Sequence, residues 1–190
     1  MIAGGLITEN PFGLAKLHWC EGRFCVTTAT ELCLGGVVVT LPDALQSAVP
    51  KRRSEFLAGR FCAAHALRAA GLPQTVGLMG RVPVWPQGAA GSISHSDNRA
   101  VAVGSRDYAG LGVDIEPLMT PAQAQEIQSL ILTPAEIALR PASLGFAAFL
   151  TLIFSAKESF YKALSAQLSQ MPGFLDVTML EISSDSLSLC

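Results

Sequence analysis

Gly112-Val113-Asp114-Ile115-Glu116 stands where the pattern of this 190-residue chain changes. Before this stretch, β-type runs, a helical run and further β-type runs follow one another. After it come helical runs and then β-type runs. This order favours an α+β fold made of two similar α+β halves. We therefore expect an N-terminal half over residues 1–110 and a C-terminal half over residues 111–190.

The division into halves rests on local patterns. After Pro50, apolar side chains recur at helical spacing from Lys51 to Ala70, and a second helical pattern runs from Leu144 to Leu168. Thr133 and Glu136 have the spacing of a helix capping box. Strands are predicted within residues 17–41 and at residues 92–95, 100–104, 111–116, 175–182 and 186–190, with an ordered loop over residues 81–91.

Two carboxylates alternate with apolar residues in the opening stretch. In a strand, Asp114 and Glu116 would share one face, while Val113 and Ile115 would face the core. Hard oxygen ligands suit Mg²⁺, which commonly takes one or two carboxylates together with substrate phosphate oxygens. The alternative is a solvated polar face on an amphipathic strand.

The second candidate group lies in the C-terminal helical run. The i, i+4 spacing puts Glu158 and Lys162 on one helix face, with Lys157 facing elsewhere. Glu158 is a possible third metal ligand, and Lys162 is suited to neutralising a leaving phosphate. An ordinary surface ion pair between Glu158 and Lys162 is the alternative.

The third candidate group is basic and lies on the N-terminal helical run. Arg53 and Arg60 are seven residues apart, so they return to nearly the same helical angle, and such a pair can grip a phosphate. Lys51 precedes them. A solvated basic first turn is the competing interpretation.

Ser94 and His95 are adjacent, which suggests at first a catalytic serine and its base. Neighbouring residues of a strand point to opposite faces, so they are badly placed for that pairing. His95 is either a structural histidine or a phosphate donor at a strand end. Arg81, ahead of the Pro-rich loop, is a similar and weaker candidate.

The composition argues against several classes of protein. The net charge of −2 argues against general nucleic-acid binding. The longest apolar stretch, Phe146 to Phe154, is far shorter than the roughly 20 residues of a spanning helix. Residues 1–16 lack the pattern of a signal peptide, so we expect a cytoplasmic protein without a membrane span. Its five cysteines are then expected to be reduced and mostly buried, rather than joined as a Cys20–Cys25 disulfide or metal half-site.

Taken in order, five stretches of the chain resemble the 4'-phosphopantetheinyl transferases of the enterobactin-synthase-component type. They cover roughly residues 50–182 and are the Arg-x-x-Glu-Phe-Leu-Ala-Gly-Arg stretch ending at Arg60, Arg81-Val-Pro-Val-Trp-Pro, Gly91-Ser-Ile-Ser-His95, Gly112-Val-Asp-Ile-Glu116 and Phe154-Ser-Ala-Lys-Glu-Ser-Phe-Tyr-Lys162.

The resemblance implies a monomeric, pseudo-dimeric fold of two α+β halves, with coenzyme A in the cleft between them. It implies that Mg²⁺ is bound by Asp114, Glu116 and Glu158, and that Glu158 and Lys162 are catalytic. The residues implied to hold the coenzyme are Arg53, Arg60, Arg81, Ser94, His95 and, more weakly, Lys157, with help from Lys51.

The implied reaction moves the 4'-phosphopantetheine group of coenzyme A to a serine of an apo acyl, peptidyl or aryl carrier protein and releases adenosine 3',5'-bisphosphate. Siderophore or other nonribosomal peptide assembly is the favoured pathway. Relatives of this type continue for several strands beyond residues 175–182, which leaves open a naturally short chain or a truncated form. The alternatives are a non-catalytic coenzyme A binding relative and, with little support, a serine-dependent hydrolase that uses Ser94 and His95.

Overall fold

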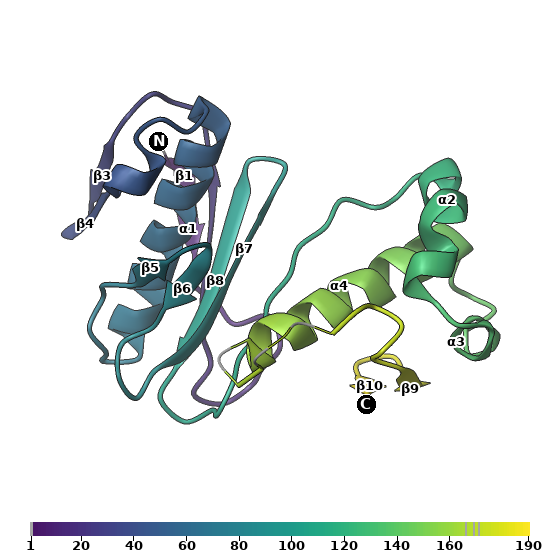
Figure 1. The fold of residues 1–190 in the computed structure, drawn as a ribbon. Helices are drawn as coiled ribbons and strands as arrows, with labels where there is room; N and C mark the ends of the chain where they lie inside the picture. The colour runs from purple at the N-terminus through teal and green to yellow at the C-terminus, as the bar shows by residue number, and fades with distance from the viewer. Residues whose placement is uncertain (1, 166, 169, 171) are drawn as a thin grey trace. The chain divides into compact units, whose positions relative to one another are not determined.

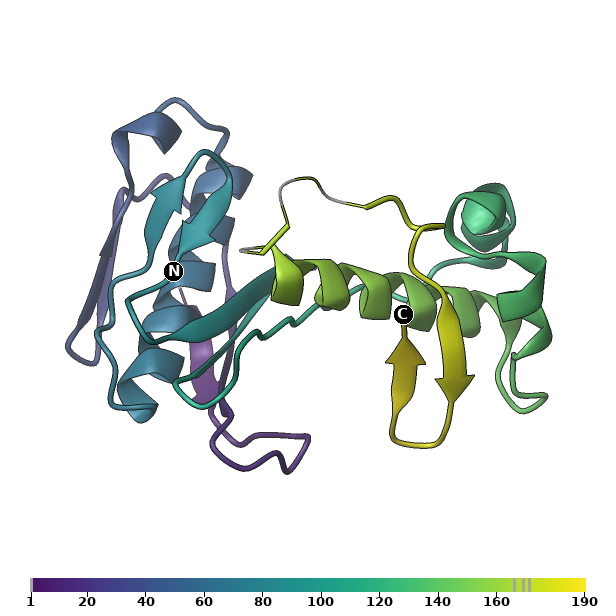
Figure 2. The same cartoon turned by 60° about the horizontal axis from the view of Figure 1, so that its bottom comes forward.

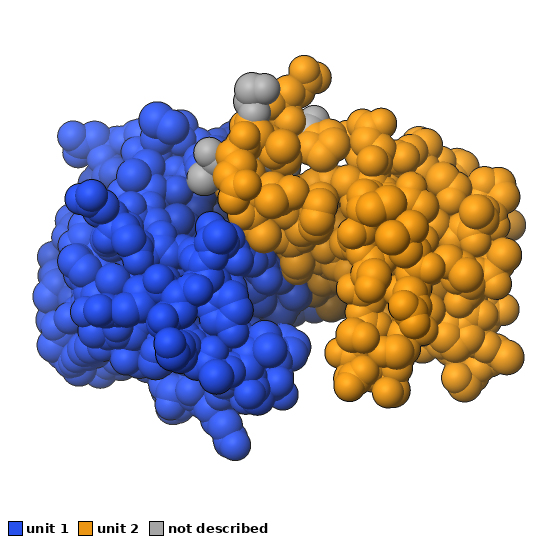
Figure 3. Space-filling view, turned by 90° about the horizontal axis from the view of Figure 1, so that it is seen from below, with its two compact units in different colours: residues 1–115 blue, residues 116–190 orange. Residues whose placement is uncertain are grey.

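The computed structural model describes residues 2–165, 167–168, 170 and 172–190. The chain divides into two compact units, Met1–Ile115 and Glu116–Cys190, which Figure 3 shows in different colours. Each unit combines helices with antiparallel strands, so the α+β class is confirmed. The similarity of the two halves stays a prediction.

Unit 1 is built on a four-stranded antiparallel sheet in the order β1-β2-β8-β7, and α1 packs across β2 and β8 (Figure 1). Two further hairpins, β3–β4 and β5–β6, flank the helix and sheet. The elements are β1 (Ile2–Ile7), β2 (His18–Phe24), β3 (Glu31–Leu34), β4 (Val37–Thr40), a short 3-10 helix (Asp43–Leu45), α1 (Pro50–Ala69), β5 (Gly77–Met79), β6 (Val82–Val84), β7 (Ala90–Ser96) and β8 (Arg99–Ser105).

Small residues let α1 lie close to the sheet. Pro50 occupies the first turn of the helix, where its missing N–H costs nothing. A Cβ at Gly59 would stand 2.8 Å from the Ile93 side chain, so only glycine permits this approach of α1 to β7. The residues around Gly59 on α1 are thereby held directly above β7.

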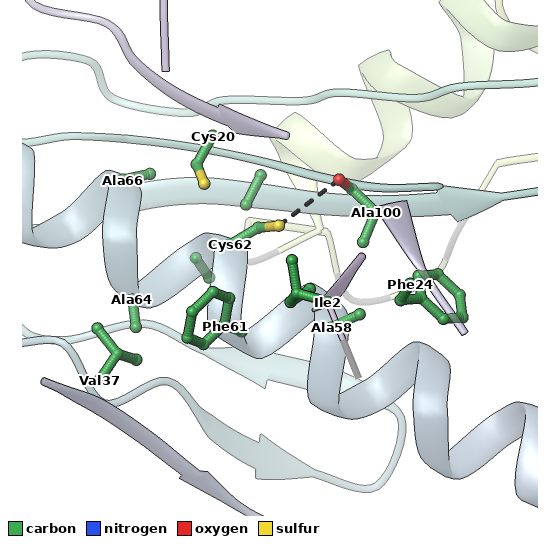
Figure 4. Close-up of a cluster of buried hydrophobic side chains, with 12 residues drawn as sticks. Ile2, Cys20, Phe24, Val37, Ala58, Phe61, Cys62, Ala64, Ala66 and Ala100 are labelled. Atoms are coloured by element: carbon green, nitrogen blue, oxygen red, sulfur yellow. Dashed lines mark hydrogen bonds between the residues drawn. The ribbon is translucent and has the colours of Figure 1, made fainter. Parts of the chain in front are cut away.

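Figure 4 shows the core between α1 and the sheet. Phe61 and Cys62 of α1 are completely buried there, and the Cys62 thiol donates a hydrogen bond to the Ala100 carbonyl at 3.5 Å. Contact with the Cys20 thiol, together with burial, raises the pKa of Cys62. The expectation that most cysteines are buried was wrong, because Cys25, Cys33 and Cys190 are exposed.

The prediction of a strand at residues 111–116 was wrong: residues 111–120 belong to neither a helix nor a strand. The prediction that Val113 and Ile115 face the core is confirmed. Val113 is buried against Leu17, Trp19, Val101 and Val103 of the sheet face opposite α1, and Ile115 packs against the same cluster. Packing on this cluster, rather than pairing with a neighbouring strand, accounts for the alternating pattern.

The predicted loop over residues 81–91 is also only partly correct. Val82–Val84 form β6, and Ala90 begins β7. Asp97 and Asn98 form the turn between β7 and β8, and both have positive φ values, of 46° and 60°, as a two-residue hairpin requires. This turn places His95 near the end of β7.

The described residues of unit 2 form three helices and one hairpin, and Figure 2 shows the hairpin next to α4, with its strands running across the direction of the helix. Phe149, Leu150 and Ile153 of α4 are buried in its core. The capping box of Thr133 and Glu136 was predicted correctly, and α4 ends at Leu164, before the predicted end of the helix. The elements are α2 (Pro121–Ile131), α3 (Pro134–Ala138), α4 (Phe146–Leu164), β9 (Met179–Ile182) and β10 (Leu187–Leu189).

Candidate functional site: a basic pocket and a set of carboxylates

A small cavity of about 110 Å³ in unit 1 is bordered by four basic side chains. It lies among α1, the β5–β6 hairpin and β7. We call it the arginine pocket. It is lined by Arg52, Glu55, Phe56, Gly59, Arg60, Leu78, Arg81, Pro83, Ile93 and His95.

Arg60 forms the buried wall of the arginine pocket. Only 8% of the residue is exposed, its Nη2 donates to the Gly77 carbonyl at 2.9 Å, and its guanidinium lies 4.9 Å from the centre of the Phe56 ring. Within the described part of the chain, its Nε has no hydrogen-bond partner. Burial, and then the nearby charge of Arg52, lower the pKa of Arg60 to about 10. Because a buried cation with an unsatisfied N–H is costly, an anion in the pocket would stabilise it.

Arg52, Glu55 and His95 form the more open side of the pocket. Arg52 Nη1 lies 3.4 Å from His95 Nε2 and 3.8 Å from Glu55 Oε2. Glu55 Oε1 is 3.9 Å from His95 Nδ1. Lys51 is next to this group and lines a neighbouring cavity of about 490 Å³, which also includes Glu55 and His95.

The structure does not bring Arg53 into the arginine pocket. Arg53 Nη2 donates to the carbonyls of Thr28 and Ala29, at 2.6 and 3.4 Å, and so ties the segment before β3 to α1. Although Arg53 and Arg60 share a helical angle, seven residues separate them by about 10 Å along the axis. Arg52, and not Arg53, lines the pocket together with Arg60. Its i, i+3 and i, i+4 spacing to Glu55 and Phe56 was the signal that could have identified it.

Ser94 and His95 contact different groups, as their adjacent positions on β7 predicted. Ser94 is buried; its hydroxyl donates to Asp114 Oδ1 at 2.9 Å and accepts from the Ile115 N–H at 3.3 Å. His95 instead lies beside Arg52 and Glu55. This arrangement gives no support to a serine–histidine pair, and it gives Ser94 a role in orienting the Asp114 carboxylate.

The other predicted carboxylates belong to unit 2. Glu116 is exposed at the start of the unit, and Glu158 is partly buried on α4, as is Lys162 one turn later. Among the residues that the structure describes, no three His, Cys, Asp or Glu side chains are grouped closely enough to hold a metal ion. The three predicted metal ligands therefore stay a prediction.

Lys157 has a different environment from the phosphate contact suggested for it. It is completely buried, and its ammonium contacts Glu136 Oε1 at 2.7 Å and the carbonyls of Ile131 and Phe174 at 2.8 and 2.9 Å. Glu136 is equally buried and also accepts from the Met179 and Thr133 N–H groups. These contacts make Lys157 a structural residue of unit 2.

Two comparisons with known proteins bear on this arrangement. The family model described as the 4'-phosphopantetheinyl transferase N-terminal domain matches residues 41–105. The model of the 4'-phosphopantetheinyl transferase superfamily matches residues 110–190.

In the described residues, no helix is both long enough and apolar enough to cross a membrane.

Individual relatives agree with the family models. Enterobactin synthase component D of Salmonella typhimurium is 45% identical over 150 residues, which are 77% of this chain and 62% of that protein. The Escherichia coli K12 protein of the same name is 45% identical over 181 residues, covering 91% of this chain and 81% of that protein. The 4'-phosphopantetheinyl transferase PptT of Mycobacterium tuberculosis is 36% identical over 133 residues, covering 67% of this chain and 58% of that protein.

The match thus spans about three fifths of the Salmonella relative. The family models nevertheless cover most of this chain, from residue 41 to residue 190 with a short gap. The resemblance seen in the sequence is confirmed: the chain belongs to the 4'-phosphopantetheinyl transferase superfamily.

Proposed function

We propose that the chain transfers the 4'-phosphopantetheine group of coenzyme A to a serine of an apo carrier protein and releases adenosine 3',5'-bisphosphate. The observation that carries this proposal is the arginine pocket, where Arg52, Arg60, Arg81 and His95 surround a small cavity. The names of the relatives support the choice of reaction. A phosphate group is the ligand that this donor set suits best, because guanidinium groups bind its oxygens through charge-assisted hydrogen bonds.

The arginine pocket is assigned to a phosphate of coenzyme A. Arg60 supplies a buried Nε–H that has no hydrogen-bond partner in the described part of the chain. Arg52 and His95 supply donors on the open side, where they are 38% and 32% exposed and accessible to a ligand. Arg53 is left out of this set because it does not line the pocket and its Nη2 instead donates to the Thr28 and Ala29 carbonyls.

The predicted metal ligands Asp114, Glu116 and Glu158 fit Mg²⁺ in their chemistry, since all three offer hard carboxylate oxygens. The Ser94 hydroxyl bond to Asp114 Oδ1 restrains the orientation of the first of them. When bound there, Mg²⁺ would neutralise charge on the phosphate oxygens of the substrate. The proposal assigns these three residues to the metal, and Ser94 to positioning Asp114.

In the proposed reaction, Glu158 accepts the proton of the carrier serine, directly or through a water. The serine oxygen then forms a bond to the pantetheine-side phosphorus, and the bond to the leaving phosphate breaks. Lys162, one turn from Glu158 on α4, stabilises the negative charge that develops on the leaving side. Catalysis is thus mainly positioning and electrostatic stabilisation, as in other phosphoryl transfers.

The carrier is proposed to be an acyl, peptidyl or aryl carrier protein, and the chain is proposed to act on it in the cytoplasm as a monomer. The relatives named enterobactin synthase component D favour siderophore assembly among the possible pathways. A chain that bound coenzyme A without transferring it would be the non-catalytic alternative, and the experiment below separates the two.

The test is mass spectrometry of an apo carrier protein incubated with this chain, coenzyme A and Mg²⁺. We expect one phosphopantetheine on the carrier serine, and none with EDTA or with the Asp114→Ala variant. The variant should keep its circular dichroism spectrum, because Asp114 is only partly buried and belongs to no helix or strand. Normal turnover by Asp114→Ala would refute the metal assignment, and binding of coenzyme A without transfer would leave only the non-catalytic alternative.

A further inference from the structure

One carboxylate lies inside the pocket that we assign to a phosphate. Glu55 lines both the arginine pocket and the neighbouring cavity, and its side chain is only 15% exposed. A negative charge at this position repels any anion that enters. Its presence therefore needs a physical explanation.

Glu55 does not hold its neighbours by hydrogen bonds. Its oxygens are 3.8 Å from Arg52 Nη1 and 3.9 Å from His95 Nδ1, whereas hydrogen bonds of this type extend to about 3.2 Å. At such distances the Coulomb interaction is still substantial in a partly buried site. Glu55 thus acts on the pocket through its charge rather than by orienting Arg52 and His95 with hydrogen bonds.

The charges of the lining residues match one phosphate group when Glu55 is included. Arg52, Arg60 and Arg81 are three cations, and Glu55 reduces their sum to +2 when His95 is neutral. A phosphate monoester carries about −1.5 to −2 at neutral pH. Without the carboxylate the pocket would hold an excess positive charge even after a phosphate had bound.

Taking the proposed function as its basis, we propose that Glu55 is a specificity-determining residue that limits the affinity of the arginine pocket for phosphate. The carboxylate keeps the pocket from retaining adenosine 3',5'-bisphosphate, the product that shares the nucleotide phosphates of coenzyme A. Coenzyme A also has the pantetheine-side phosphate and the pantetheine arm, which the product lacks, so its binding depends less on the arginine pocket. Glu55 thereby favours release of the product.

Removing the charge of Glu55 should strengthen the binding of adenosine 3',5'-bisphosphate. Glu55→Gln keeps the shape of the side chain and removes the charge, so it should bind adenosine 3',5'-bisphosphate about tenfold more tightly, which corresponds to about 1.4 kcal/mol. The gain should shrink at high ionic strength, because salt screens a partly exposed charge. The product should also inhibit transfer by this variant at a correspondingly lower concentration.

The measurement is isothermal titration calorimetry with adenosine 3',5'-bisphosphate and with coenzyme A, at low and high salt. Glu21→Gln is the matched control, because Glu21 is 13% exposed, pairs with Arg99 at 2.7 Å and lines neither the arginine pocket nor the neighbouring cavity. It removes the same charge and should leave the affinity unchanged. Glu55→Asp retains the charge and should bind the product nearly as weakly as the unaltered chain.

The titrations distinguish an incorrect role for Glu55 from an incorrect assignment of the pocket to a phosphate. If the unaltered chain binds the bisphosphate, Arg52→Ala weakens that binding and Glu55→Gln leaves it unchanged or weakens it, then Glu55 is a positioning residue and the inference is wrong. An equal gain in affinity from Glu21→Gln would also overturn it. If the unaltered chain binds neither coenzyme A nor the bisphosphate, the assignment of the pocket fails and the inference fails with it.

Discussion

The arginine pocket of unit 1 and the Glu136–Lys157 pair of unit 2 both combine cations with a carboxylate, but they differ in contact distance and in the balance of charges. Glu136 and Lys157 are both completely buried and 2.7 Å apart. In the pocket, Glu55 is 3.8 Å or more from its partners, and the cations outnumber it. A closed set of short contacts stabilises a fold, whereas an excess of cations with longer contacts leaves capacity for a ligand.

Electrostatics supports this distinction. Burial alone would raise the pKa of Glu136, but the Lys157 ammonium and the Thr133 and Met179 N–H groups hold that pKa below its ordinary value. In the pocket, burial and Arg52 instead lower the pKa of Arg60. The charge of Glu136 is thus stabilised by contacts within unit 2, whereas burial and the charge of Arg52 destabilise the charge of Arg60.

The largest effect should come from breaking the closed pair. Lys157→Met leaves the Glu136 carboxylate buried without its cation, which should cost about 3–5 kcal/mol of stability. Urea unfolding followed by circular dichroism measures this loss. Lys16→Met is the control, because Lys16 pairs with Asp107 at 3.0 Å while 68% exposed, and such surface pairs contribute about 0–1 kcal/mol.

Replacing both members of the pair sharpens the result. Glu136→Gln with Lys157→Met should be less destabilising than Lys157→Met alone, because no buried charge then lacks its partner. If Lys157→Met keeps its full stability and instead weakens coenzyme A binding, Lys157 is a phosphate ligand and the contrast between the two regions fails.

The second effect compares two neighbouring arginines. Arg52→Ala should weaken coenzyme A binding roughly 10- to 100-fold, because it removes a charge-assisted contact worth about 1.5–3 kcal/mol. Arg53→Ala removes the same charge from the same turn of α1 but should change the affinity much less. It should instead loosen the segment at Thr28 and Ala29, which hydrogen exchange would detect.

Dephospho-coenzyme A, which lacks the 3'-phosphate, shows which phosphate of coenzyme A the arginine pocket binds. If the arginine pocket holds the 3'-phosphate, Arg52→Ala will weaken binding of coenzyme A but hardly that of the dephospho form. If it holds the pyrophosphate, both ligands will lose affinity equally. A greater loss with Arg53→Ala than with Arg52→Ala would contradict the position of the pocket on α1.

The smallest effect concerns pH. Burial, and then the charge of Arg68, lower the pKa of His65 in α1 from its ordinary value of 6.5. The folded state therefore binds this proton less readily than the unfolded state, and the stability of unit 1 should fall as the pH drops below 6.5. The contribution of Glu136 changes in the same direction but in a lower pH range: it is fully present above pH 4.5 and is lost as the pH falls through the lower pKa of the folded state.

Hydrogen exchange at pH 7.5 and pH 5, corrected for the intrinsic exchange rate, tests this difference. Protection of α1 should decrease by less than about tenfold, given that His65 is only partly buried, while α4 should be unaffected. His65→Gln should remove most of the change in α1. An equal loss of protection in both helices would show that the two units do not respond separately to pH.

Much of the secondary structure could be predicted because its causes are local. Pro50 and the helical repeat of apolar residues specify α1, and the side chains of Thr133 and Glu136 cap α3 across three residues. The prediction of a strand at residues 111–116 was wrong, because a strand forms only where a neighbouring strand pairs with it, and residues 111–116 have no such pairing. Alternation alone cannot tell pairing from packing against the Val113 cluster.

The candidate site could be predicted by residue type and region but not residue by residue. The basic helix, His95 and the carboxylates were identified from their spacing. Arg52, which lines the arginine pocket, was not among the candidates. Arg53 and Lys157 were candidates, and their observed contacts come from distant parts of the chain: the carbonyls before β3 for Arg53, and Glu136 for Lys157.

The sequence by itself determined the α+β class, the family and the main helices, because helix signals and family motifs are read from neighbouring residues. Only the tertiary structure decided which charges are satisfied internally and which line a cavity. That outcome depends on how deeply each group is buried and on which carbonyls and carboxylates the fold brings within reach, as Lys157 and Arg60 show. Neither quantity can be obtained from spacing along the chain.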